Sequence, residues 1–179
     1  MPDQFSVRLL ERKDISHVVN YWQTASEKHL NAMGIEKKDL SALDNLEVYM
    51  TNQLLLPYSE KSALYTIGLL NNEPYGHCYI NSIDYGNEAH MHLHVWNFEI
   101  RQKGLGTQMV KQAIPLFFKH LKLKTLICEP YALNPAANKT LEKLGFQFEK
   151  CYTSTPSGWD FKLKVNRWKL TRSTFKALY

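Results

Sequence analysis

Hydrophobic and polar residues follow two spacings along the chain, and these predict a mixture of strands and helices. Alternation or short apolar runs predict strands at residues 5–10, 63–70, 74–83, 90–97, 124–129, 146–152 and 161–170. Helical spacing predicts helices from residue 14, over residues 40–56, from about residue 107 to 120, and from residue 134 to about 144. Their order predicts an α/β (α+β) fold in which helices cover the faces of one mixed sheet.

Residues with strong local preferences mark the ends of these elements. Asp14 is a candidate N-cap of the first helix, and Asn134-Pro135 is a candidate start of the fourth. The pair Asn71-Asn72 favours a tight hairpin turn, and Gly145 suits the end of the fourth helix. The polar segment 29–38 is expected to connect the first two helices.

Length and charge limit the class of protein. The 179 residues are enough for one domain with its own core, which we expect to span residues 1–179. The hydrophobic share of 44% and charged share of 22% are ordinary for a globular protein. The net charge of +5 suits an anionic ligand. Because the basic residues are scattered and form no stripe, no nucleic-acid partner is expected.

Three cysteines, Cys78, Cys128 and Cys151, have no CxxC spacing, and the first two lie in strand-like apolar runs. Buried, reduced thiols are the simplest interpretation. No apolar run approaches the ~18 residues that span a bilayer, and the first residues lack a signal-peptide pattern. The expectation is therefore a cytoplasmic protein with no membrane partner, either a monomer or a homodimer.

A basic, glycine-containing turn, Arg101-Gln102-Lys103-Gly104-Leu105-Gly106-Thr107, joins a predicted strand to a predicted helix. Backbone N–H groups at a helix start attract anions, and glycine lets a diphosphate approach closely. A dinucleotide fingerprint needs a third glycine, and a Walker loop needs Gly-Lys-Ser/Thr. Neither motif is present, so the turn by itself predicts a phosphate-bearing ligand of undetermined kind.

Further motifs follow this turn at characteristic spacing. They are Glu129, then Asn134-x-x-Ala137, then Leu141-Glu142-Lys143-Leu144-Gly145-Phe146. Together with Arg-x-x-Gly-x-Gly they resemble the GNAT superfamily of acyl-CoA-dependent N-acyltransferases. The branch with ribosomal-protein N-terminal and aminoglycoside 6′-N-acetyltransferases looks most similar. The resemblance implies a mostly antiparallel sheet of about seven strands flanked by about four helices, with acetyl-CoA as donor and no metal.

The resemblance also implies roles for individual residues. Glu129 would be the general base that deprotonates the amine, or else a strand-end carboxylate that binds a backbone N–H or a nearby lysine. A tyrosine often serves as general acid where this chain has Leu141, so Tyr131, Tyr152 or water would have to replace it. CoA would be held by the strand end, the turn and the motif asparagine, that is by Val95, Trp96, Asn97, Arg101, Gln102, Lys103, Gly104, Leu105, Gly106, Thr107 and Asn134. The asparagine is equally well explained as a helix N-cap.

His90, His92 and His94 recur at every second residue and share one face of their predicted strand with Trp96. The opposite face is apolar and should pack under the helix that follows the turn, so the histidines should face the first two helices. A catalytic or substrate-binding role for His92 or His94 is one interpretation. Ordinary hydrogen-bonded histidines are another, and a metal site a third, although no third ligand is evident.

These observations predict an enzyme that moves an acetyl group from acetyl-CoA to a primary amine by direct attack on the thioester. The acceptor would be a protein N-terminus or a small-molecule amine. The alternative is a GNAT-like module that binds acyl-CoA without catalysis. Tyr21, Trp22 and Tyr49 on the first helices could line an amine pocket or pack in the core.

Overall fold

The computed structural model describes residues 3–97, 104–155 and 160–178. Its strands form one seven-stranded sheet in the order β1-β2-β3-β4-β5-β7-β6. Neighbouring strands are antiparallel except β4 and β5, which are parallel. Their bounds are β1 Phe5–Leu9, β2 Ala63–Leu70, β3 Glu73–Asp84, β4 Glu88–Val95, β5 Thr125–Cys128, β6 Gln147–Ser154 and β7 Leu163–Thr171. The predicted mixed sheet is thus confirmed.

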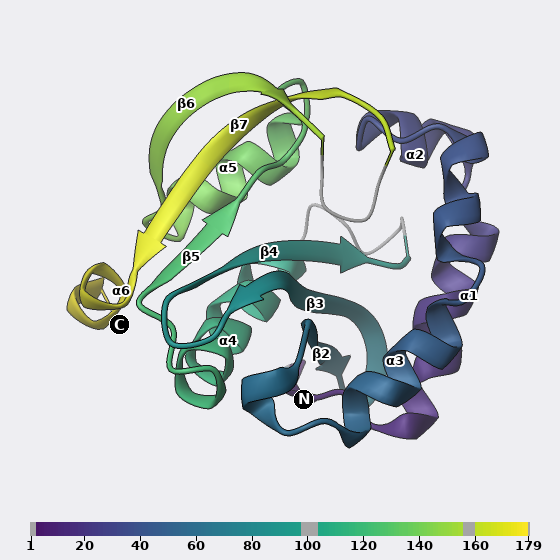
Figure 1. The fold of residues 1–179 in the computed structure, drawn as a ribbon, viewed down its shortest axis with the longest axis horizontal. Coiled ribbons are helices and arrows are strands. Elements are labelled where there is room, and N and C mark those ends of the chain that lie inside the picture. The colour runs from purple at the N-terminus through teal and green to yellow at the C-terminus, as the bar shows by residue number, and fades with distance from the viewer. Residues whose placement is uncertain (1–2, 98–103, 156–159, 179) are drawn as a thin grey trace.

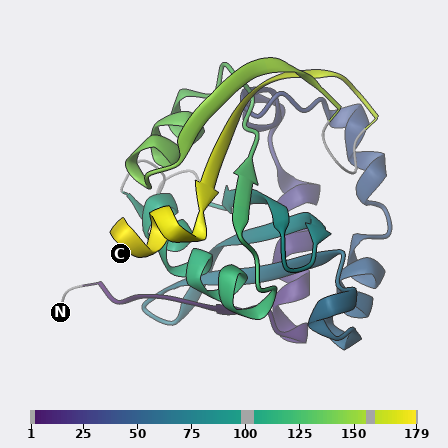
Figure 2. The same cartoon turned by 60° about the vertical axis from the view of Figure 1, so that its left-hand side comes forward.

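Six α-helices occur in the described residues and pack on both faces of the sheet (Figures 1 and 2). They are α1 Ile15–Thr24, α2 Glu27–Ala32, α3 Leu46–Leu55, α4 Leu105–His120, α5 Pro135–Lys143 and α6 Arg172–Leu178. Short 3₁₀ turns cover Arg12–Asp14, Lys37–Leu43 and Tyr58–Glu60. Helices α2 and α6 come in addition to the four that the spacing predicted.

Two hydrophobic cores lie on opposite faces of the sheet. The first joins the apolar face of β4 to α4, with Met91, Met109 and Ile114 at most 1% exposed. The second lies under α1 to α3 and contains Tyr21 and Trp22. Both rings pack against His94, at centroid distances of 5.4 and 4.8 Å. The predicted split of the histidine strand into an apolar and a helix-facing side is therefore confirmed.

Several local predictions are also confirmed. Asn71 and Asn72 both have positive φ, 52° and 68°, as a type I′ hairpin turn requires. The Asn134 side chain caps α5 by accepting from the Ala137 N–H at 3.2 Å. Gly145 has φ of +80° immediately after the last turn of α5.

Three predictions in the N-terminal region are wrong. Asp14 does not cap α1, because its buried carboxylate instead accepts two hydrogen bonds from Arg8, at 2.6 and 2.9 Å. The helix expected over residues 40–56 begins only at Leu46, after a 3₁₀ segment. Residues 29–32 of the segment expected as a connection belong to α2, which Ser26 caps and which the fully buried Leu30 anchors. Burial of one leucine thus decided a helix that the polar sequence around it did not indicate.

Candidate functional site

A cleft opens where the parallel strands β4 and β5 separate. Their pairing ends at His90 and Ile127, and beyond these residues the two strands diverge (Figure 1). A cavity of about 160 Å³ lies in the gap. Its β4 wall includes His92, Leu93 and His94, and its β5 wall runs from Cys128 to Tyr131. Where two strands separate, the main-chain N–H and C=O groups between them no longer pair across the sheet.

The alternation of β4 determines which main-chain groups face the cleft. The Trp96 N–H donates to the Tyr75 carbonyl at 3.0 Å and so faces β3. The Cys128 thiol donates to the Met91 carbonyl at 3.1 Å, so residue 91 faces β5. Main-chain groups alternate in direction along a strand, so those of Leu93 and Val95 point to the same side as those of Met91. Leu93 was absent from the predicted cofactor contacts, although counting by two from the strand end would have found it.

The start of α4 lies beside this cleft. Gly104 directly precedes the helix with φ of +82°, a conformation that favours glycine. A Cβ on Gly106 would lie 3.3 Å from Leu93, so this glycine lets the helix approach β4. The first-turn N–H groups, including that of Thr107, have no acceptor within the helix. Arg101, Gln102 and Lys103 of the predicted loop lie outside the described residues.

Asn134 combines two features that the sequence presented as alternatives. Its side chain caps α5, and it also lines the cleft between β4 and β5. Leu141, at the position where relatives often have a tyrosine, lines the same cleft and is 3% exposed. The capping bond fixes the orientation of the asparagine, so the cap and a place beside a bound ligand are compatible.

Glu129 lies at the end of β5 within a network of polar contacts. It accepts hydrogen bonds from Tyr152 at 2.5 Å and Arg167 at 2.8 Å, and His90 lies 3.7 Å away. Burial alone would raise its pKa, but these two hydrogen bonds and the charges of His90 and Arg167 outweigh that effect and lower it. Glu129 is therefore ionised at neutral pH and holds its proton weakly.

This network predicts a pH dependence of stability. A carboxyl whose folded-state pKa is depressed stabilises the protein above its unfolded pKa, here 4.5, and loses that contribution as the pH falls below it. Glu129→Gln should therefore flatten the decline in unfolding free energy below about pH 4.5. Denaturant unfolding of both proteins between pH 3 and pH 7 would measure this, and parallel pH curves would contradict it.

His92 is held in place on two sides. Its ring stacks on Tyr79 with a centroid distance of 4.6 Å, and its Nε2 lies 3.0 Å from the Asn81 side-chain oxygen. With that oxygen as acceptor, Nε2 carries the proton and Nδ1 the lone pair. Burial and then the neighbouring His90 lower its pKa to about 4. His92 is thus neutral at pH 7.

His94 belongs to a chain of hydrogen bonds that leads out of the cleft. Its Nδ1 lies 3.0 Å from the Tyr21 hydroxyl, and the same hydroxyl lies 2.7 Å from Nε2 of His29. His94 is 9% exposed, whereas His29 on α2 is only partly buried. The three side chains therefore connect the cleft wall to the surface. His29 was missed by the sequence argument because it lies 65 residues from His94, on a helix that was not predicted.

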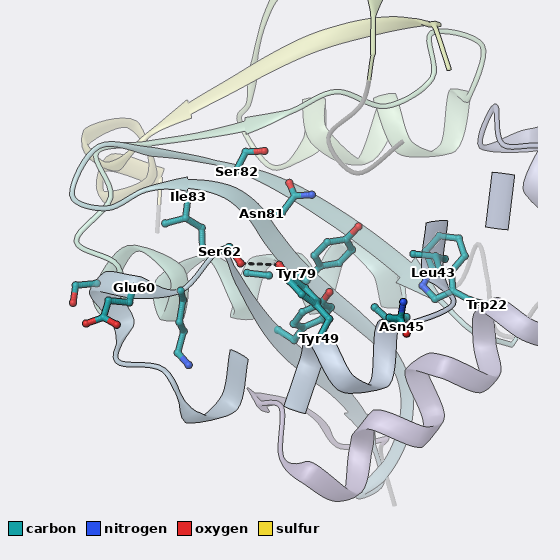
Figure 3. Close-up of a pocket in the computed structure, with 15 residues that line it drawn as sticks. Trp22, Leu43, Asn45, Tyr49, Glu60, Ser62, Tyr79, Asn81, Ser82 and Ile83 are labelled. Atoms are coloured by element: carbon teal, nitrogen blue, oxygen red, sulfur yellow. Dashed lines mark hydrogen bonds between the residues drawn. The ribbon is translucent and has the colours of Figure 1, made fainter. Parts of the chain in front are cut away.

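A second, larger pocket of about 780 Å³ lies on the same face of the sheet, between α3 and strands β2 and β3 (Figure 3). Tyr49 points into it from α3 and bonds to Ser62 at 2.9 Å, as the dashed line in Figure 3 shows. Trp22 from α1 and Tyr79 and Asn81 from β3 complete much of its wall. Tyr79 and Asn81 are also the partners of His92, so this pocket adjoins the β4–β5 cleft.

The described ranges contain neither a cluster of metal ligands nor a helix that could span a membrane. In residues 3–97, 104–155 and 160–178, no three side chains of His, Cys, Asp or Glu gather as metal ligands. No helix in the same ranges is both long and apolar enough to cross a membrane.

Comparisons with known proteins agree with this geometry. The family model described as an acetyltransferase (GNAT) domain matches residues 5–147. Spermidine N-acetyltransferase from Vibrio cholerae, solved with CoA and spermine, has a TM-score of 0.75 and 19% identity, covering 97% of this chain and 98% of that one. Aminoglycoside acetyltransferase AAC(6′)-Ib, solved with coenzyme A, has a TM-score of 0.70 and 20% identity over the same shares. No curated protein sequence matches the chain.

Proposed function

The chain belongs to the GNAT acetyltransferase family, and on this premise we propose how it transfers an acetyl group from acetyl-CoA to an amine. The neighbouring structures, which contain CoA with spermine or with kanamycin, support a CoA thioester as donor and an amine as acceptor. The acceptor is a primary amine, on a small molecule or at a protein N-terminus. The observation that carries the proposal is the cleft between β4 and β5, with His94 in its wall and the start of α4 beside it.

Acetyl-CoA would lie along the diverging part of β4. Its diphosphate would accept hydrogen bonds from the first N–H groups of α4, where the helix dipole favours an anion. Its pantetheine arm would pair with the cleft-facing main chain of Leu93 and Val95. A main-chain N–H there would polarise the thioester carbonyl and stabilise the negative charge that develops on its oxygen. Asn134 would contact the arm from the opposite wall.

Among the three predicted catalytic residues, we assign the base to His94. The amine arrives protonated and must lose a proton before its nitrogen can attack the carbonyl. Nε2 of His94 is buried, and it takes that proton once the bound amine reaches it. Nδ1 then passes a proton to the Tyr21 oxygen, and the Tyr21 hydroxyl passes its own to Nε2 of His29, which exchanges with solvent. The nitrogen then bonds to the carbonyl carbon, the carbon–sulfur bond breaks, and the second proton of the nitrogen passes through water to the departing thiolate.

We assign positioning roles to the other two. His92 is neutral at pH 7 and lies between the cleft and Asn81, so it would orient the incoming amine. Glu129 is engaged by Arg167 and Tyr152, and its lowered pKa makes it a weaker base than an ordinary glutamate. It would set the shape and charge of the cleft wall and hold the Tyr152 hydroxyl in place.

Glu129→Gln should accordingly lower kcat by about tenfold or less, far below the ~10²–10⁴-fold cost of removing a general base. The affinity for CoA should not change. Steady-state kinetics and calorimetry would measure the two effects. A loss of kcat above a hundredfold at unchanged CoA affinity would instead identify Glu129 as the base.

The overall function is tested by following free thiol release from acetyl-CoA with a panel of amines. We expect turnover with at least one primary amine and release of one thiol per amine acetylated. Binding of CoA without turnover on any amine would favour the alternative of a non-catalytic acyl-CoA sensor.

We further propose a reducing, cytoplasmic location and a single catalytic domain over the whole chain. Cys78, Cys128 and Cys151 are free thiols, which supports the first statement. The solved acetyltransferases match 97% of the chain, which supports the second. Either a monomer or a homodimer is compatible with this arrangement, and size-exclusion chromatography with light scattering would distinguish them.

A further inference from the structure

The pocket between α3 and the sheet, shown in Figure 3, has a chemical character that the reaction itself does not require. Its wall is rich in uncharged groups that both donate and accept hydrogen bonds. These are the phenols of Tyr49, Tyr65 and Tyr79, the hydroxyls of Ser59, Ser62 and Ser82, and the amides of Asn45 and Asn81. Such groups are matched by a ligand with several hydroxyls.

Two of these phenols lack a protein partner. Tyr65 is 8% exposed and Tyr79 is partly buried, and both line the pocket. Neither hydroxyl makes a hydrogen bond within the described part of the chain, whereas Tyr49 bonds to Ser62. Burial raises the pKa of both groups, so they remain neutral donors. Neither hydroxyl oxygen is among the buried polar atoms that lack a partner, so both are accessible from the pocket, where they are available to a ligand.

The orientation of the rings supports this interpretation. Tyr65 stacks on Tyr79 at 4.8 Å with an interplanar angle of 12°, and Tyr79 stacks on His92 at 4.6 Å. The three rings therefore form a continuous row across β2, β3 and β4. Because rings stack on both faces of Tyr79, a ligand meets its hydroxyl-bearing edge and not its faces.

The charge of the pocket argues against a polyamine. Among the described residues in its wall, Glu60 carries the one carboxylate and Lys61 the one ammonium. Glu60 is exposed, and the Lys61 ammonium donates to the Gln53 carbonyl. A ligand with three or four ammonium groups would find its charges uncompensated there. For a ligand with one amine and several hydroxyls, hydrogen bonds to the wall would replace most of the hydration energy that is lost on binding.

We propose that this pocket is the acceptor site, and that it takes an amino sugar, that is, an amine carried on a hydroxylated ring. The proposal rests on the acetyltransferase function above. A volume of about 780 Å³ accommodates a ligand of drug-like size, so more than one ring has room. The sugar hydroxyls bond to Tyr65 and Tyr79, and the amine extends past His92 into the β4–β5 cleft.

The test compares Tyr65→Phe and Tyr79→Phe with the wild-type enzyme, using D-glucosamine, spermidine and an unblocked tripeptide as acceptors. Each substitution removes one hydroxyl and keeps the ring, so that the stacking of Tyr65 on Tyr79 and of Tyr79 on His92 is preserved. We expect D-glucosamine to have the highest kcat/KM of the three. Each variant should raise its KM about 3- to 10-fold, the loss of one hydrogen bond, and leave the KM for acetyl-CoA unchanged. Tyr85→Phe, on the exposed turn after β3, is the matched control and should change neither value.

Stability provides a second readout. A purely structural role would make Tyr65→Phe less stable, whereas removal of an unpartnered hydroxyl should leave Tm unchanged or raise it. An unchanged KM for D-glucosamine in both variants, or a preference for spermidine or the tripeptide, would overturn the proposal and leave the acetyltransferase function intact.

A separate measurement distinguishes failure of the site from failure of the function. Calorimetry with D-glucosamine on the CoA-saturated protein reports binding without turnover. Binding that both variants weaken, in a protein that acetylates none of the three amines, would support the pocket and count against the enzymatic function. An absence of D-glucosamine binding would count against the pocket.

Discussion

Gly104→Glu is expected to weaken CoA binding about a hundredfold. The new carboxylate would stand directly before the first N–H groups of α4, where we place the diphosphate. Like charges in contact cost several kcal/mol, and every 1.4 kcal/mol changes an affinity tenfold. The φ of +82° adds backbone strain for any residue other than glycine. Isothermal calorimetry with CoA measures the effect.

Gly86→Glu is an unusually close control for this experiment. Gly86 also has φ of +82°, and for both glycines an added Cβ would meet no described atom within 4 Å. The two variants therefore share the backbone strain and the added charge. They differ in position, since Gly86 lies in the turn between β3 and β4 and not at the start of α4. Gly86→Glu should bind CoA like the wild type. Equal affinities of the two variants would remove the start of α4 as the diphosphate site.

The second large effect is expected at His94. His94→Gln should lower kcat about a hundredfold or more, because it removes the group that accepts the proton of the amine. The KM for acetyl-CoA should stay within about twofold, since we assign the CoA contacts on β4 to the main chain. His120 packs against Tyr58 away from the cleft, so His120→Gln is the control and should keep full activity. Steady-state kinetics at pH 6 to 9 would provide these values.

Tyr21→Phe tests the proton path beyond His94. The variant keeps the ring that packs on Trp22 and His94 but removes the hydroxyl between the two histidines. It should lower kcat about tenfold or more and move the pH–rate profile, with an unchanged affinity for CoA. A normal pH profile and rate in Tyr21→Phe, combined with an inactive His94→Gln, would mean that His94 passes its proton directly to solvent.

Much of the fold could be predicted because local chemistry decides it. Asn71 and Asn72 occupy positive φ in their hairpin, and Asn134 caps α5, since each arrangement needs only neighbouring residues. The alternation of His90, His92 and His94 determined a common face for the same reason. The errors arose where a partner from another element intervened. Arg8 on β1 donates to the carboxylate of Asp14, which therefore does not cap α1.

The candidate site divides in the same way. The glycines at the start of α4 and the spacing to Glu129 and Asn134 indicated the donor end, because a diphosphate is bound by a helix start that short motifs encode. The contacts of Glu129 could not be predicted, since Tyr152 and Arg167 reach it from two further strands. Those contacts lower its pKa, and they are why we assign the base to another residue.

The sequence by itself determined most of the element order and the histidine face, which follow from periodicity. Its short motifs indicated the family and the donor, through resemblance to known acyltransferases. Tertiary structure alone decided which side chains meet. It brought His29 to Tyr21 and His94, separated β4 from β5 beyond His90, and left the hydroxyls of Tyr65 and Tyr79 without a protein partner in the described chain. These features depend on how far-apart segments pack, because hydrogen bonding and burial are properties of neighbours in space and not of neighbours in sequence.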